Sequence, residues 1–219
     1  MRDKFQNKGF NRIINHYRAK QILKYALGEY CLELGCGEGQ ITKKLINRFE
    51  RVYAIDNNKN SLKYVTKKAI VGHDDLNEIN YYTFPHVDYV VCSNVIEHLS
   101  NPKTILKKIS KIGHKNTLFF FSVPNARSVN RILGSNCGIL KIPESLGKHD
   151  IEAGHKKMYN LYTFSRLIKK SFKILENGSF CYKPFPNATM EILPPSIIKK
   201  CMEMKMNHMG GELFVVCKK

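Results

Sequence analysis

The chain has 219 residues, of which 43% are hydrophobic and 25% charged, and its formal net charge is +18. This length and composition fit one globular domain with a full hydrophobic core. No apolar stretch approaches the roughly 20 residues of a transmembrane helix, and residues 1–11 lack the apolar run of a signal peptide. We therefore expect a soluble, cytoplasmic protein with no membrane insertion.

The first half of the chain alternates between strand-like and helix-like hydrophobic patterns. A helix is predicted over residues 13–27, followed by strands over 30–34, 51–55, 69–72, 87–93 and 117–123. Helices are predicted between them over 41–49 and 61–68, and from Pro102, which suits the first turn of a helix. Repeats of this kind predict a parallel sheet with helices on its faces.

Residues 125–160 break this pattern, with only a short helical patch near 129–133. So long an irregular segment is functional or mobile in a compact domain, and we expect it to cover the substrate as an insertion in a single domain, 1–219. A helix over 163–170, a strand over 172–182, a helix after Pro195 and a strand over 213–217 follow. The last two strands are expected to pair antiparallel at one sheet edge.

The positive charge and the cysteines limit the possible ligands. The 28 lysines outnumber the 8 arginines, so the charge is either a solvated background or the mark of an acidic ligand. Arginine patches interleaved with exposed aromatic residues, typical of base recognition, are absent from the sequence. Seven cysteines without a Cys-x-x-Cys pair argue against zinc and against a disulfide framework.

The strongest functional signal is the sequence ELGCGEGQ at residues 33–40, between the first strand and a helix. Gly35, Gly37 and Gly39 let the backbone turn sharply and approach a ligand closely. Asp56 ends the second strand, where a carboxylate can accept hydrogen bonds from both hydroxyls of a ribose. A glycine-rich turn without a ligand and a helix-capping aspartate are the alternative interpretations.

Together these residues resemble the class I S-adenosylmethionine-dependent methyltransferases. Residues 33–39 resemble their first motif, Asp56 matches their acidic residue after the second strand, and VVCSNVIEHL at 90–99 resembles the fourth motif of the ubiquinone-biosynthesis-like group. The resemblance spans roughly residue 17 to the C-terminus. It implies a Rossmann-like, doubly wound α/β sheet of about seven strands, mainly parallel, with one antiparallel strand at the C-terminus.

The resemblance also implies S-adenosylmethionine as cofactor and a set of residues around it. The glycine loop would lie against the methionine portion, Glu33 would help to hold either the loop or the methionine amino group, and Asp56 would bind the ribose. Asp75, in preference to Asp74, would meet the adenine amino group. The implied cofactor-binding residues are Glu33, Gly35, Cys36, Gly37, Gly39, Gln40, Asp56, Asn57, Asp74, Asp75, Leu76, Ser93 and Asn94.

A second resemblance is to bacterial methyltransferases from surface-polysaccharide gene clusters. It rests on SVPNA at 122–126 and GHKKMY at 154–159, with Phe164 and Leu167, and implies that these segments border the substrate pocket. Methyl transfer mainly requires alignment of nucleophile and cofactor and exclusion of water. Where the acceptor loses a proton, a histidine is the first candidate for the base.

Three residues of the irregular segment are the catalytic candidates: His155, then His149, and Asp150. A structural hydrogen-bonding role is the alternative for each histidine. Glu97 and His98 allow a metal interpretation, because in ubiquinone-type relatives an additional glutamate precedes this pair and joins it in binding a divalent ion. Here that position is a neutral amide, Asn94, which weakens such a site. We therefore expect no metal, and His98 to cap or pack at the next helix.

The sequence thus predicts a methyltransferase that acts on an oxygen or nitrogen of a small metabolite, such as a phosphorylated or nucleotide-linked one. Surface carbohydrate biosynthesis is the expected setting. RNA methylation, motivated by the net charge, and a catalytically inactive cofactor-binding partner subunit are the alternatives. Five basic residues near the expected cleft would suit a phosphate, unless they face solvent. They are Arg127, Arg131, Lys148, Lys156 and Lys157.

Overall fold

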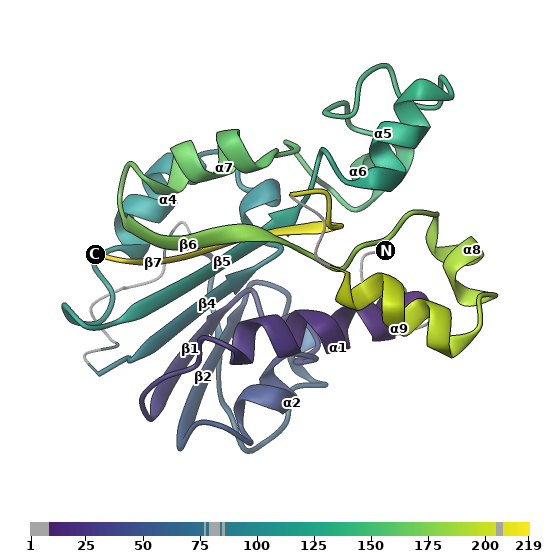
Figure 1. Ribbon diagram of the computed structural model, residues 1–219. Coiled ribbons are helices and arrows are strands. Elements are labelled where there is room, and N and C mark those ends of the chain that lie inside the picture. Colours follow the sequence, from purple (N-terminus) through teal and green to yellow (C-terminus); the bar gives the residue numbers. More distant parts are fainter. Residues whose placement is uncertain (1–8, 77, 79–83, 85, 205–207) are drawn as a thin grey trace.

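The chain folds around one seven-stranded sheet in a computed structural model (Figure 1). The structure describes residues 9–76, 78, 84, 86–204 and 208–219. The strands are β1 (Tyr30–Leu34), β2 (Arg51–Asp56), β3 (Ile70–His73), β4 (Tyr89–Ser93), β5 (Leu118–Pro124), β6 (Lys173–Phe180) and β7 (Glu212–Lys218). The α-helices are α1 (Phe10–Leu23), α2 (Thr42–Leu45), α3 (Lys59–Leu62), α4 (Pro102–Ile109), α5 (Val129–Asn136), α6 (Lys148–Glu152), α7 (Leu161–Ile168), α8 (Asn187–Glu191) and α9 (Pro195–Glu203).

The strand order is β3-β2-β1-β4-β5-β7-β6. The first five strands pair in parallel, whereas β7 runs antiparallel to both of its neighbours, β5 and β6. This confirms the predicted mixed α/β sheet with one antiparallel strand. It also confirms that the last two strands pair antiparallel, with β6 at the edge.

Both faces of the sheet are covered by helices, which explains the continuous apolar strands. Side chains alternate across a strand, so Phe119 and Phe121 of β5 join one buried cluster and Phe120 joins the other. The first cluster includes residues of α4 and α7, and the second includes residues of α1 and α2. These helix pairs lie on opposite sides of the sheet in Figure 1.

Two helices are shorter than predicted. The predicted helices over 41–49 and 61–68 appear as α2 and α3, which have four residues each and continue as turns. In α3 the helix stops before Tyr64-Val65-Thr66, and two of these residues branch at Cβ, which lowers helix propensity. α1 has nearly the predicted length but is shifted toward the N-terminus, since it begins at Phe10 and ends at Leu23.

Residues 125–160 contain the predicted helical patch as α5 and a further short helix, α6, that the pattern did not reveal. Both helices stand away from the sheet in Figure 1. Two arginines of this segment hold it together: Arg127 pairs with Glu144, and Arg131 pairs with Asp150. That the segment covers the substrate stays a prediction. No helix within the described residues is long and apolar enough to cross a membrane.

Candidate functional site

The glycine loop after β1 has a backbone that only glycine adopts readily. Gly35, Gly37 and Gly39 have φ angles of 78°, 52° and 75°, in the left-handed region that side chains disfavour. A Cβ on Gly35 would lie 2.2 Å from Cγ2 of Val95. The loop is therefore fixed both by its backbone conformation and by close packing.

Asp56, at the end of β2, holds this loop through backbone hydrogen bonds. Its Oδ2 accepts from the N–H of Gly37 at 2.8 Å, and its Oδ1 accepts from the N–H of Asn58 at 2.8 Å. The N–H of Gly35 also donates to the carbonyl of Ile55, at 2.8 Å. The predicted ribose contact of Asp56 stays a prediction, and the structure adds a role in positioning the loop.

Glu33 of β1 is buried beneath the loop, with 4% of its surface exposed. Its Oε2 accepts a hydrogen bond from the hydroxyl of Thr42 at 2.6 Å. Burial raises the pKa of Glu33 to about 8, against the opposite effect of the Thr42 hydroxyl, and the nearby charge of Asp56 adds to the rise. A carboxyl group in this state is sensitive to any positive charge brought beside it.

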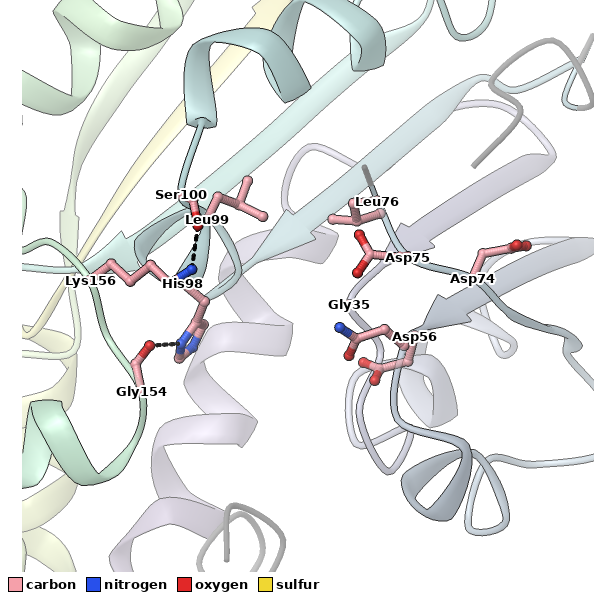
Figure 2. Close-up of a pocket in the computed structure, with 11 residues that line it drawn as sticks. Gly35, Asp56, Asp74, Asp75, Leu76, His98, Leu99, Ser100, Gly154 and Lys156 are labelled. Carbon is pink, nitrogen blue, oxygen red and sulfur yellow. Dashed lines mark hydrogen bonds between the residues drawn. The ribbon is translucent and has the colours of Figure 1, made fainter. Parts of the chain in front are cut away.

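A cavity of about 290 Å³ lies beside the loop (Figure 2). One side of its lining consists of predicted cofactor-binding residues, namely Gly35, Asp56, Asn57, Asp74, Asp75 and Leu76. Figure 2 shows the other side, where the Lys156 ammonium donates to the Ser100 hydroxyl. The sequence analysis missed two residues of the lining, Leu99 and Ser100, whereas Gly154 belongs to a segment that was expected to border the substrate pocket. Three carboxylates give the cavity an acidic rim.

The remaining predicted cofactor residues lie around the loop and at the end of β4. Glu33, Cys36 and Gly39 are buried, and Gln40 lines a different cavity. Ser93 and Ser122 share a hydrogen bond of 2.6 Å between their hydroxyls. Asn94 has a φ of 55°, and its buried Oδ1 has no hydrogen-bond partner within the described part of the chain. Contacts of these residues with a cofactor stay predictions.

Of the three catalytic candidates, His155 and Asp150 lie together in the structure and His149 lies apart from them. Nδ1 of His155 lies 3.5 Å from Oδ1 of Asp150, and the His155 side chain is 12% exposed. Nη1 of Arg131 lies 2.8 Å from Oδ2 of Asp150, which also accepts from the N–H of Gly147. Burial raises the pKa of Asp150, but the approach of His155 and the hydrogen bonds from Arg131 and Gly147 outweigh it and hold the pKa well below its usual range. His149 is exposed on α6 and joins neither contact.

His98 lies beside His155, so that the 3₁₀ turn η3 (Ile96–His98) meets the irregular segment. The two rings are 4.8 Å apart and edge to face. Nδ1 of His98 lies 3.1 Å from the carbonyl oxygen of Gly154, which can only accept, so this nitrogen is the donor. Nε2 of His98 lies 3.9 Å from Oε1 of the buried Glu97. His98 therefore packs against the irregular segment as well as preceding α4.

Glu97, His98 and His155 offer ligand atoms that all lie within 4.8 Å of one another. Ligands at about 2.1 Å from a tetrahedral ion are only about 3.4 Å apart, so these groups would have to move inward to hold one. The donor types fit a divalent transition metal, but their spacing is too wide without this contraction. The expectation that no metal binds stays a prediction.

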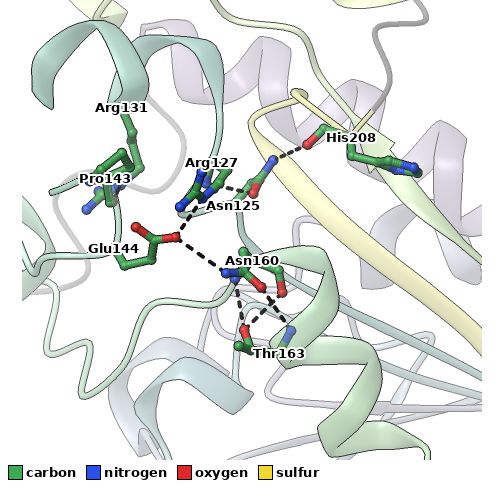
Figure 3. A network of polar contacts seen from close by, with 8 residues as sticks. All are labelled: Asn125, Arg127, Arg131, Pro143, Glu144, Asn160, Thr163 and His208. Carbon is green, nitrogen blue, oxygen red and sulfur yellow. Dashed lines mark hydrogen bonds and ion pairs between the residues drawn. The ribbon is translucent and has the colours of Figure 1, made fainter. Parts of the chain in front are cut away.

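Two of the basic residues proposed for a phosphate are occupied by ion pairs. Arg127 lies in the polar network of Figure 3, where its Nε lies 2.7 Å from Oε1 of Glu144. Arg131 is bound to Asp150, as described above, and Lys156 lines the acidic cavity. Lys148 and Lys157 are exposed. The structure therefore does not gather these five residues into one anion site.

Two further anchors escaped the sequence analysis. Asn125, in the SVPNA motif, donates from Nδ2 to the carbonyls of His208 and Gly210 at 2.8 and 2.7 Å (Figure 3). Arg18 of α1 forms a largely buried ion pair with Glu212 of β7. The two residues of this pair are 194 positions apart. Local patterns carry no signal for a contact over that separation.

The chain resembles known methyltransferases both in sequence and in fold. Residues 32–121 match the family model described as a methyltransferase domain. The ubiquinone biosynthesis O-methyltransferase of Vibrio cholerae serotype O1 is 28% identical over 151 residues, which are 63% of this chain and 60% of that protein. The chain thus spans about 60% of the length of this curated relative.

Solved structures share the fold over nearly the whole chain. A SAM-dependent methyltransferase from Archaeoglobus fulgidus has a TM-score of 0.66 at 18% identity and covers 98% of both chains. The N-methyltransferase NodS from Bradyrhizobium japonicum, in complex with S-adenosyl-L-homocysteine, has a TM-score of 0.61 at 13% identity. That match covers 99% of this chain and 92% of NodS.

The solved structures share the fold of this chain, and residues 32–121 match a methyltransferase domain, so the class that the chain resembles is the S-adenosylmethionine-dependent methyltransferases. Within that class, the ubiquinone biosynthesis O-methyltransferases of Vibrio cholerae and Erwinia tasmaniensis are relatives in sequence. The predicted resemblance to the ubiquinone-biosynthesis-like group is therefore confirmed. The predicted resemblance to methyltransferases of surface-polysaccharide gene clusters stays a prediction.

Proposed function

We propose that this chain transfers the methyl group of S-adenosylmethionine to an oxygen or nitrogen of a small metabolite. The observation that carries the proposal is the glycine loop tied to Asp56 at the edge of a cavity lined by Asp74 and Asp75. Carboxylates accept hydrogen bonds from ribose hydroxyls and from an adenine amino group. The same acidic rim disfavours a nucleic-acid backbone, which supports a small acceptor over RNA.

The acceptor setting proposed is surface carbohydrate biosynthesis. Its support is the motif at residues 122–126, whose Asn125 forms a β-bridge with Tyr159 of the second motif. The N–H of Ala126 also donates to the carbonyl of Tyr159 at 2.8 Å. Both motifs thus lie together next to the segment that carries His155. The relatives in sequence described above are O-methyltransferases, which favours oxygen as the acceptor atom.

The chemical step is a displacement at the methyl carbon. A lone pair of the acceptor forms the new bond to carbon while the carbon–sulfur bond breaks, and its electrons neutralise the sulfonium to give S-adenosylhomocysteine. The proton that leaves the acceptor passes to His155. Asp150 lies on the Nδ1 side of this ring, so it would orient His155 and stabilise the imidazolium that forms.

Calorimetric titration with S-adenosylhomocysteine tests the cofactor assignment. The wild-type protein should bind it, and Asp56→Ala should weaken binding by about 1–3 kcal/mol, the scale of losing hydrogen bonds to a charged group. Glu50→Ala is the matched control and should change the affinity little, because it removes an exposed carboxylate that does not line the cavity. A folded wild-type protein without affinity for this product would refute the proposed function.

Turnover with a panel of hydroxylated and amino acceptors, followed as S-adenosylhomocysteine formation, tests the base. His155→Ala should lower kcat by about a hundredfold or more, as expected for loss of a general base, with cofactor affinity unchanged. His149→Ala is the control. It removes an exposed histidine six positions before His155, and this variant should keep wild-type turnover. Equal turnover in both variants would remove His155 from the mechanism.

A further inference from the structure

A second cavity, of about 340 Å³, lies between α1 and α2. Its lining comes from two segments, with Arg12, Ile13, Asn15 and His16 from α1 and Gln40 and Lys44 from the loop end and α2. Gly35 at the start of the glycine loop lines the first cavity, and Gln40 just beyond its last glycine lines the second. The same loop therefore borders both cavities.

The two cavities have opposite charge. Three aspartates and one lysine, Lys156, line the first cavity, whereas the charged residues of the second are Arg12 and Lys44, with no carboxylate among its described lining residues. A positively charged hollow attracts anions because the low-dielectric walls concentrate the field. The first cavity suits the hydroxyls and amino group of a nucleoside, so the second is the better place for a negatively charged group.

The cations of this second cavity differ in their ion pairing from those between residues 18 and 24, in the second half of α1 and just after its end. Arg18, Lys20 and Lys24 each lie within ion-pair distance of a carboxylate, on Glu212, Glu203 and Glu176 respectively. Within the described part of the chain, no ion pair joins Arg12 or Lys44 to a carboxylate. The positive charge that the described fold leaves unmatched on this helix is thus concentrated at the second cavity.

The wall that carries Arg12 is fixed to the sheet. The largely buried pair between Arg18 and Glu212 joins α1 to β7, and Ala19 and Ile22 are buried in the core cluster on that face. Arg12 and His16 lie four residues apart, so they share one face of the helix. The guanidinium fork of an arginine and the ammonium of a lysine are the groups that bind phosphate and carboxylate most strongly.

We propose that this cavity binds the anionic group, a phosphate or a carboxylate, of the methyl acceptor. The inference rests on the proposed methyl transfer, since the acceptor has to approach the cofactor beside the glycine loop. Arg12 and Lys44 form charge-assisted hydrogen bonds to the anion, and Gln40 at the loop end can donate from its amide. The basic residues of the 125–160 segment are not required, because Arg127 and Arg131 are already paired.

Calorimetric titration of inorganic pyrophosphate into the protein saturated with S-adenosylhomocysteine tests this site. Arg12→Gln and Lys44→Gln should each weaken pyrophosphate binding about tenfold, the effect of losing one charge-assisted hydrogen bond. Lys43→Gln is the matched control. It removes the same charge as Lys44→Gln, but the Lys43 side chain does not line the cavity. It should leave the affinity within about twofold.

Three outcomes would overturn the inference. Equal weakening by Lys43→Gln would show that general surface charge attracts the probe. A loss of S-adenosylhomocysteine affinity in Arg12→Gln and Lys44→Gln, with pyrophosphate binding intact, would assign the cavity to the carboxylate of the cofactor. Absence of pyrophosphate binding to the wild-type protein would remove the site. Failure of the proposed function is distinguishable, because it appears as absent S-adenosylhomocysteine binding in the wild type.

Discussion

Cofactor binding should release protons from the protein through Glu33. Because its pKa is raised to about 8, this carboxyl is protonated in roughly nine molecules of ten at pH 7. The ammonium of the methionine portion, expected beside Glu33, favours the carboxylate and lowers the pKa on binding. Up to about 0.9 proton per cofactor should therefore be released at pH 7. Ionising the group at pH 7 costs about 1.4 kcal/mol, so affinity should rise as the pH is raised toward 8 and level off above it.

Calorimetry at pH 7 in buffers of different ionisation enthalpy measures this release directly. The observed binding enthalpy should vary linearly with the buffer enthalpy, and the slope should correspond to about 0.9 proton released. Glu33→Gln keeps an oxygen that can accept from Thr42 but has no proton to release, so its slope should be close to zero. A flat plot for the wild type, or the same slope in the variant, would refute the assignment.

Three other perturbations test the site and the fold. Gly35→Ala should lower the free energy of unfolding by about 2 kcal/mol or more, because the residue has a positive φ and the new Cβ clashes with Val95. Gly138→Ala has the positive φ without a clash and should lower it by about 1 kcal/mol. Urea denaturation measures both. In the same assay, Arg18→Met should cost about 3 kcal/mol, and Lys24→Met, which breaks an exposed pair, less than about 1 kcal/mol. Dialysis against EDTA should leave turnover unchanged, and a loss of activity restored by one divalent ion would contradict metal-free catalysis.

The sheet was predictable because its signal is local. The central parallel strands β1, β4 and β5 are short, mainly apolar runs that are buried on both faces, and the strand predicted over 30–34 coincides with β1. The lengths of α2 and α3 were not predictable from periodicity. Each helix has only four residues and is followed directly by turns, although the hydrophobic pattern continues. Tertiary packing, which periodicity does not encode, decides where such short helices end.

The candidate site was also predictable only where its signal is local. The loop from Gly35 to Gly39 and the position of Asp56 follow from a motif within 24 residues, 33–56, and the structure joins them by a hydrogen bond. The pairing of Arg131 with Asp150 and the approach of His98 to His155 depend on the path of the 125–160 segment. A polar group can find its partner anywhere on a folded surface, so no spacing rule in the sequence reveals these contacts.

The position of β7 has a consequence for synthesis on the ribosome. β6 touches the sheet only through β7, which comes later in the chain. Residues 173–180 consequently have no strand to pair with until residues 212–218 have emerged and inserted beside β5. A nascent chain stalled between these two points would expose the open edge of β5, an aggregation-prone surface, and truncation before residue 212 would remove two strands from the sheet.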